Sequence, residues 1–172
     1  TTNIFNCLSP YNAKGKKTER FNDTMIRASV AEAAVKGVEA QLLQPGHGWV
    51  PWWTSKLVPL AEHEAWFQSH YGTKPSNPVH DYLRAGGDRV GTFIDECHKH
   101  QTAALISYRV NDIHHLEWAD KPNAKHSHAL SRFYVEHPEF RIGATTSKDD
   151  RAHNWLIPEA RAYKLSLIDE ML

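Results

Sequence analysis

Five polar side chains suited to acid–base chemistry and hydrogen bonding are crowded into one short stretch of the chain. They follow an apolar run, Ala103 to Tyr108, whose composition predicts a strand covered on both faces. The five residues are Arg109, Asn111, Asp112, His114 and His115. Because α/β proteins bind ligands and place catalytic groups at the carboxyl ends of their strands, we expect any chemistry of this chain to be located here.

Asp112 is the candidate catalytic residue, since a carboxyl group can act as acid, base or nucleophile. Binding a substrate, orienting a catalytic neighbour and simply closing the loop are the alternatives for this side chain. Arg109 and Asn111 are two residues apart, so on an extended strand both would face one pocket. Arg109 would bind an anionic group of a ligand or form an internal salt bridge. Asn111 would bind hydroxyl groups or form part of a turn.

A long segment from Gly46 to Gly87 carries a second group of candidate binding residues. Trp49, Trp52 and Trp53 lie close to His47 near its start. Three tryptophans within five positions argue against disorder, and long loops in compact domains are usually functional, so we expect a ligand-facing loop. The indole rings would either form a platform for sugar rings or anchor the loop on the scaffold.

The rest of the chain alternates between strand and helix patterns, which predicts an α/β fold with a parallel sheet. The predicted strands are Asn3–Leu8, Val38–Leu43 and Ala103–Tyr108, and the predicted helices run from Asn22 or Asp23 to Lys36, from Asp88 to His100 and from Pro158 to Leu172. Shorter helices are predicted over 61–71 and 127–136. On the last helix one apolar stripe is formed by Ala160, Lys164, Leu167, Ile168 and Met171.

Three such strand–helix units alone would make an incomplete fold, because parallel strands need cover on both faces. Eight units close a (β/α)8 barrel of about 250 residues. We therefore expect residues 1–172 to be the N-terminal portion of a single barrel domain, with long loops after its strands. The remainder of the barrel would then be a partner, in the same polypeptide or in a second chain.

The composition excludes several classes of function. Lys plus Arg and Asp plus Glu each number 20, so the chain has no net charge with which to attract a nucleic acid. No apolar run approaches the ~18 residues of a membrane span. The sequence also lacks the GxGxxG, GxxxxGK[ST] and GxSxG motifs, which disfavours dinucleotide binding, P-loop chemistry and a serine nucleophile elbow.

Histidine is abundant, with 12 in the chain, and the loop that follows the last predicted strand carries His114, His115, His126 and His128. Imidazoles bind transition metals, but these spacings match no metal motif, so we expect neither a metal nor another cofactor. A neutral imidazole that binds a sugar is the preferred role of His114.

The cellular location stays open in the sequence. No signal peptide is visible, and the chain begins at Thr1. If a leader has been removed, we expect a periplasmic or secreted protein; if none has, we expect a cytoplasmic one. Cys7 and Cys97 are far apart and belong to no metal spacing; two free thiols are preferred over a disulfide.

Two segments resemble a group of bacterial glycosyl-hydrolase-like TIM-barrel proteins: GTFIDECHKHQTAALISYRVND, over 91–112, and WLIPEARAYKLSLIDEML, over 155–172. In that group a helix of the type FIDECHKHG leads to a third strand that ends in R-x-N-D-x-H. Here the helix reads FIDECHKHQ, and Arg109, Asn111, Asp112 and His114 match the second pattern. The early strand with Asn6 and the tryptophan-bearing loop fit the same template. A fourth strand with acidic residues follows in that group, and this sequence stops before it, so the resemblance places one or both catalytic carboxyls beyond Leu172.

The resemblance implies a glycoside hydrolase that cleaves O-glycosyl bonds of a poly- or oligosaccharide, with its cleft at the carboxyl ends of the strands. The candidate substrate-binding residues are Asn6, His47, Trp49, Trp52, Trp53, Arg109, Asn111 and His114, with Asp112 as the candidate catalytic residue. A non-catalytic carbohydrate-binding barrel is the first alternative. A metal-dependent hydrolase that uses the histidine-rich loops is the second.

Overall fold

The computed structural model describes residues 20–47, 49–75, 77–121, 130–143 and 151–172 of the chain. These residues form two compact units. Unit 1 contains the described residues of Thr1–Pro45 and Asn77–Ser107, and unit 2 contains those of Gly46–Ser76 and Tyr108–Leu172. The predicted strand Asn3–Leu8 lies outside the described residues.

The two long helices of unit 1 begin where the sequence predicts. In α1 (Asp23–Ala33) the side chain of Asn22 accepts a hydrogen bond from the Met25 amide at 3.1 Å. In α4 (Arg89–Lys99) the side chain of Asp88 accepts one from the Gly91 amide at 2.9 Å. Each cap satisfies an amide that the first helical turn leaves without a partner. Helix α1 ends three residues before the predicted Lys36.

Unit 1 also contains a short helix, α3 (Pro78–Arg84), that the sequence analysis did not predict. The side chain of Asn77 caps it by accepting a hydrogen bond from the Val79 amide at 2.9 Å. An Asn followed by Pro78 at the first helical position is a favourable helix start. This pair is the signal that would have revealed the helix.

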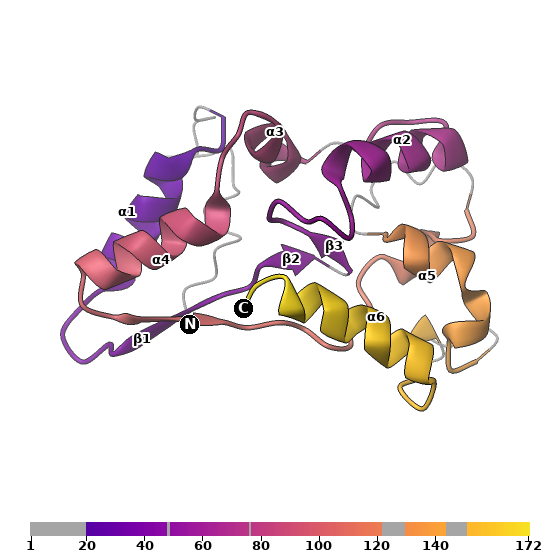
Figure 1. Cartoon of the computed structure of the whole chain (residues 1–172). Helices are drawn as coiled ribbons and strands as arrows, with labels where there is room; N and C mark the ends of the chain where they lie inside the picture. The colour runs from indigo at the N-terminus through magenta and orange to yellow at the C-terminus, as the bar shows by residue number, and fades with distance from the viewer. Residues whose placement is uncertain (1–19, 48, 76, 122–129, 144–150) are drawn as a thin grey trace. The chain divides into compact units, whose positions relative to one another are not determined.

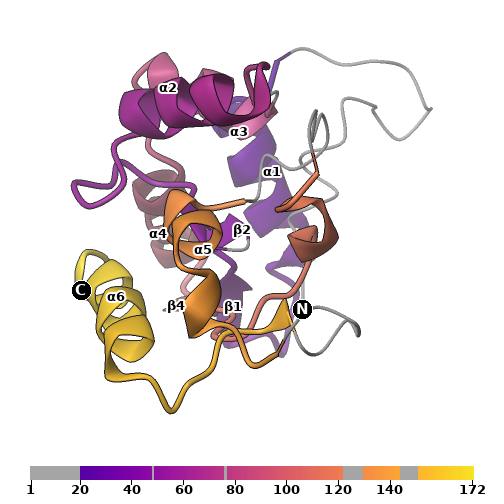
Figure 2. The same cartoon turned by 90° about the vertical axis from the view of Figure 1, so that its right-hand side faces the viewer.

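The sheet of unit 1 is a parallel pair, β1 (Ala40–Leu43) and β4 (Ala103–Ile106), in which Leu42 is opposite Leu105. Figure 1 and Figure 2 show α1 and α4 side by side along this pair. Leu43 is fully buried, but 39 % of Leu42 and 48 % of Leu105 are exposed. The prediction that the second of these strands is covered on both faces is therefore wrong, because in the described part of the chain only one face of the sheet is buried by helices.

An ionic cluster joins the two long helices of unit 1. The buried carboxylate of Glu96 on α4 accepts hydrogen bonds from Lys99 at 2.9 Å and from Arg27 on α1 at 3.0 Å. His100 lies 3.2 Å from the same carboxylate. The hydrogen bonds from Lys99 and Arg27 lower the pKa of Glu96 to about 2, so this carboxylate stays charged at neutral pH.

The turn between α4 and β4 requires a left-handed backbone at a residue with a side chain. Gln101 is exposed and has φ = 57°. Since only glycine adopts this conformation without a steric cost, we expect Gln101→Gly to stabilise the protein by about 0.5 to 1 kcal/mol. Urea unfolding of this variant beside Gln101→Ala measures the effect. The explanation fails if the alanine variant gains as much stability as the glycine variant.

Unit 2 begins with a small antiparallel hairpin, β2 (Gly46–His47) and β3 (Val50–Pro51), followed by α2 (Leu60–Tyr71). A Cβ atom at Gly46 would lie 2.6 Å from the carbonyl oxygen of Val50, so the hairpin requires a glycine there. The segment expected to be one long loop thus carries regular structure, and the predicted helix over 61–71 is confirmed.

The second half of unit 2 contains the 3₁₀ turns η2 (Leu116–Trp118) and η3 (Pro138–Phe140) and the helices α5 (Arg132–Glu136) and α6 (Pro158–Asp169). Helix α6 starts at the predicted proline. A cluster of buried residues joins α2, η2 and α5: Phe67, Tyr71, Leu116, Ala119, Leu130 and Tyr134. None of the helices that the structure describes has the length and apolar character needed to span a bilayer.

Candidate functional site

A carboxylate–imidazole pair lies at the centre of the polar stretch that follows β4. One oxygen of Asp112, Oδ1, lies 2.5 Å from Nδ1 of His114 and accepts a hydrogen bond from the His114 amide at 3.1 Å. A side chain that accepts from the amide two residues later is a common local turn of aspartate. Asp112 and His114 are therefore brought together by local backbone geometry.

The two members of this pair differ sharply in exposure. Only 1 % of the Asp112 side chain is exposed, against 53 % of the His114 side chain. The contact of Nδ1 with the buried carboxylate fixes the orientation of the imidazole ring. The arrangement places an oriented imidazole at the surface of unit 2, with its carboxylate partner buried behind it.

The neighbouring predicted site residues are at the surface of unit 2. Arg109 and Asn111 are both exposed. The strand ends at Ile106 instead of the predicted Tyr108, so the alternation of side chains along a strand does not extend to them. His115 has a left-handed backbone with φ = 65° and leads directly into η2.

A buried lysine lies on α6, close to the carboxylate of Asp112. Lys164 is 2 % exposed, and its Nζ is 4.0 Å from the ring centroid of Tyr108 and 4.2 Å from that of Trp49. Within the described residues this ammonium group has no hydrogen-bond partner. Two aromatic faces therefore provide its closest stabilisation, as cation–π contacts.

Burial changes the proton affinity of this lysine and of its neighbours. Loss of water around Lys164 lowers its pKa to about 7, although the negative charge of Asp112 acts in the opposite direction. Burial raises the pKa of Tyr108, and nearby Tyr163 and Asp112 raise it further. The phenol of Tyr108 is thus neutral at physiological pH, and Lys164 is poised between its charged and neutral forms.

Trp49 is a packing centre of unit 2. It is 2 % exposed, and its ring stacks on His153 with centroids 3.8 Å apart. Its plane is within 5° of the planes of Phe133 and Tyr163, at 6.0 and 5.9 Å. Burial lowers the pKa of His153 to about 3, so that imidazole is neutral at physiological pH.

The other two tryptophans of the predicted platform are also buried, Trp52 at 2 % and Trp53 at 8 % exposure. The indole Nε1 of Trp53 donates to Glu170 at 3.3 Å. These positions favour the interpretation in which the tryptophans anchor the loop. His47 lies in β2, and Asn6 lies outside the described residues.

Glu170, just after α6, holds the loop that follows Trp53. Its carboxylate accepts hydrogen bonds from Ser55 Oγ at 2.6 Å and from the amides of Lys56 and Leu57 at 2.6 and 2.8 Å. Burial acts to raise the pKa of Glu170, but these hydrogen bonds outweigh it, and the pKa lies below its usual value. We call this set of contacts the Glu170 clamp.

The described residues contain no group of three or more His, Cys, Asp or Glu side chains placed to hold a metal ion. His126 and His128 lie outside these residues. Cys97 is buried as a free thiol, whereas Cys7 is outside the described part. The described residues thus do not form the metal site that a metal-dependent hydrolase would need.

Sequence reasoning identified Asp112 and His114 but missed the roles of Lys164 and Glu170. Lys164 stands on the apolar stripe of the last predicted helix, and a lysine in such a stripe is the signal that could have singled it out. Glu170 carries no comparable signal, because its partners are more than a hundred residues away in the sequence. Comparison with known proteins finds no matching family model and no matching curated protein.

Proposed function

We propose that this chain is the N-terminal part of a glycoside hydrolase, and that it supplies substrate-binding groups to a cleft at the carboxyl ends of the strands. The observation that carries the proposal is the Asp112–His114 pair, a buried carboxylate that orients a half-exposed imidazole. An imidazole that is half exposed and held in one orientation is suited to a sugar hydroxyl, because its ring nitrogens can donate or accept hydrogen bonds.

The role of Asp112 follows from its burial. Cleavage of a glycosidic bond requires two carboxyl groups that reach the sugar directly. With a side chain that is 1 % exposed, Asp112 is suited to orient His114 and not to touch the bond. We therefore assign Asp112 as a positioning residue, His114 as a sugar-binding residue, and the acid and base to carboxyls on strands beyond Leu172.

The fold supports this proposal in its coarse features. The chain is mixed α/β, and the parallel pair of β1 and β4 is covered by helices on one face, as in one segment of a barrel wall. We propose that further strands of the same barrel complete the sheet. The motif R-x-N-D-x-H in the sequence supports the same assignment.

The test uses the whole protein and a panel of polysaccharides, with release of reducing ends as the measurement. We expect Asp112→Asn and His114→Ala each to lower kcat/KM by about ten- to a hundredfold, because a misplaced binding group costs that much even away from the reacting bond. His98→Gln, at an exposed position on α4, is the matched control and should keep full activity. Unchanged turnover in both site variants would refute the assignment.

A non-catalytic carbohydrate-binding barrel is the second candidate. The burial of Asp112 favours it, since the carboxyl identified in the sequence is suited to orienting the binding residue His114 and not to bond cleavage. Glycan binding that His114→Ala weakens, without turnover of any member of the panel, would establish this second function.

A further inference from the structure

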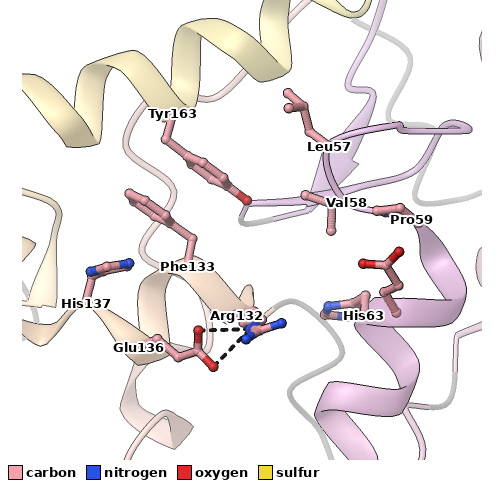
Figure 3. Close-up of a pocket in the computed structure, with 10 residues that line it drawn as sticks. Leu57, Val58, Pro59, His63, Arg132, Phe133, Glu136, His137 and Tyr163 are labelled. Atoms are coloured by element: carbon pink, nitrogen blue, oxygen red, sulfur yellow. Dashed lines mark hydrogen bonds and ion pairs between the residues drawn. The ribbon is translucent and has the colours of Figure 1, made fainter.

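A pocket of about 220 Å³ lies within unit 2, beside the start of α2. It is lined by residues of the segment before α2, of α2 itself, of α5 and of α6 (Figure 3). Neither Asp112 nor His114 lines it. Typical pockets for small ligands measure about 300 to 1,000 Å³, so this one has room for a single ring and not for a chain of rings.

The apolar walls of the pocket suit a flat ring. Phe133 and Tyr163 form one wall and stack with centroids 3.8 Å apart and planes within 2°. Leu57, Val58 and Pro59 lie across from them, and Figure 3 shows the hydroxyl of Tyr163 directed toward Val58. Aromatic and aliphatic walls of this kind pack against the C–H faces of a ring.

Polar groups surround these walls. Arg132 donates from Nε to both carboxylate oxygens of Glu136, at 2.9 Å each, and both side chains face the pocket (Figure 3). Glu62, on the exposed side of α2, supplies a second carboxylate. Because the charge of Arg132 is balanced by Glu136, the rim has no surplus positive charge to attract an anionic ligand.

The deeper polar groups are uncharged. Burial lowers the pKa of His63 to about 4, so its imidazole is neutral at physiological pH. Burial also raises the pKa of Tyr163, so its hydroxyl keeps its proton and can donate. The pocket thus combines a flat apolar wall with neutral groups in its interior and both donors and acceptors at its rim.

From this combination we propose that the pocket binds one neutral sugar ring, as an accessory site separate from the Asp112–His114 pair. A polyhydroxylated ring uses the acceptors Glu62 and Glu136, the donor Arg132 and the stacked wall together. An apolar aromatic ligand would use the stacked wall alone and would gain nothing from those polar groups. The choice of a sugar is made from the pocket's own groups and does not depend on whether the protein cleaves glycosides.

The test is titration of the protein with single-ring probes, followed by calorimetry and by NMR shifts. The probes are the methyl glycosides of glucose, galactose, mannose, xylose and N-acetylglucosamine, with methyl glucuronide and phenol for comparison. We expect at least one neutral glycoside to bind, with a dissociation constant on the order of millimolar for so small a ligand, and to bind more tightly than methyl glucuronide or phenol.

The variants locate the binding. Glu62→Gln and Tyr163→Phe should each weaken it about three- to tenfold, as expected for the loss of one hydrogen bond. Glu159→Gln, at an exposed position on α6 outside the pocket, is the matched control. Glu62 is itself exposed, so its variant remains informative even if Tyr163→Phe disturbs folding, which circular dichroism monitors.

The outcomes separate this proposal from the proposed hydrolase function. Pocket binding should be unaffected by Asp112→Asn, which should lower only turnover. If no neutral glycoside binds, if phenol or the glucuronide binds more tightly, or if Glu62→Gln changes nothing while Asp112→Asn abolishes binding, the pocket is not the sugar site. None of these results bears on whether the protein hydrolyses glycans.

Discussion

Replacing Lys164 with methionine is expected to make the protein more stable at pH 7, and this advantage should shrink by about 2 to 4 kcal/mol between pH 7 and pH 9.5. The cause is burial, which lowers the pKa of Lys164 from its ordinary 10.5 to about 7. Between these two pH values the unfolded chain holds the proton on this amine and the folded protein releases it. Stability of the wild-type protein therefore rises with pH in this window, and the methionine variant lacks that contribution.

The measurement is urea unfolding of wild type and variant at pH 7, 8 and 9.5, compared as differences at each pH. Such differences cancel the titration of groups that both proteins share. Lys56→Met, at an exposed position, is the matched control and should show no trend with pH. Parallel stability curves for wild type and Lys164→Met would contradict the burial of this amine.

Removal of the Glu170 clamp is expected to lower the free energy of unfolding by a similarly large amount. Glu170→Ala should destabilise the protein by about 2 to 4 kcal/mol, because it leaves the amides of Lys56 and Leu57 and the hydroxyl of Ser55 without their acceptor. Hydrogen bonds to a charged acceptor are among the stronger ones in proteins. The loss should also free the segment that follows Trp53.

Unfolding by urea measures this loss, and hydrogen exchange at the amides of 56 and 57 shows whether it is local. Asp169→Ala removes an exposed carboxylate one position earlier and should have a much smaller effect. Glu170→Gln keeps an acceptor oxygen and should fall between the two. Equal losses for Asp169→Ala and Glu170→Ala would show that helix-end charge, and not the clamp, is responsible.

Local signals in the sequence predicted much of the secondary structure. The side chains of Asn22 and Asp88 cap helices at the predicted positions, and Pro158 begins the last one. Capping depends on residues within one turn, so it is visible in a short stretch of sequence. The parallel pairing of the strands at 40 and 103 is likewise confirmed. It could be predicted because two apolar runs that alternate with helices leave few other arrangements.

Burial of the strands was less predictable. Apolar residues at Leu42 and Leu105 indicate a covered face, yet both are substantially exposed. A strand's composition tells which residues tolerate burial, whereas the covering elements are set by the rest of the fold. The hairpin at 46–51 was missed for a related reason, since strands of two residues are too short for a periodic pattern.

In the candidate site, too, contacts between residues close in the sequence could be predicted, and contacts between distant residues could not. The contact between Asp112 and His114 joins residues two positions apart, and their clustering in the sequence identified it. The contacts of Lys164 with Trp49 and Tyr108 join three distant stretches. No spacing rule connects such residues, so their meeting depends on tertiary packing.

The division of the chain between its two units has a kinetic consequence. Unit 1 is completed only when β4 pairs with β1 in the register Ala40 to Ala103, which closes a loop of roughly 60 residues. Closing a flexible loop of that length costs about 3 to 4 kcal/mol of chain entropy before any contact repays it. We therefore expect the α1–β1 segment to stay unfolded during synthesis until Ser107 has left the ribosome. In that interval the segment Gly46–Ser76, which belongs to unit 2, should be exposed and sensitive to proteases.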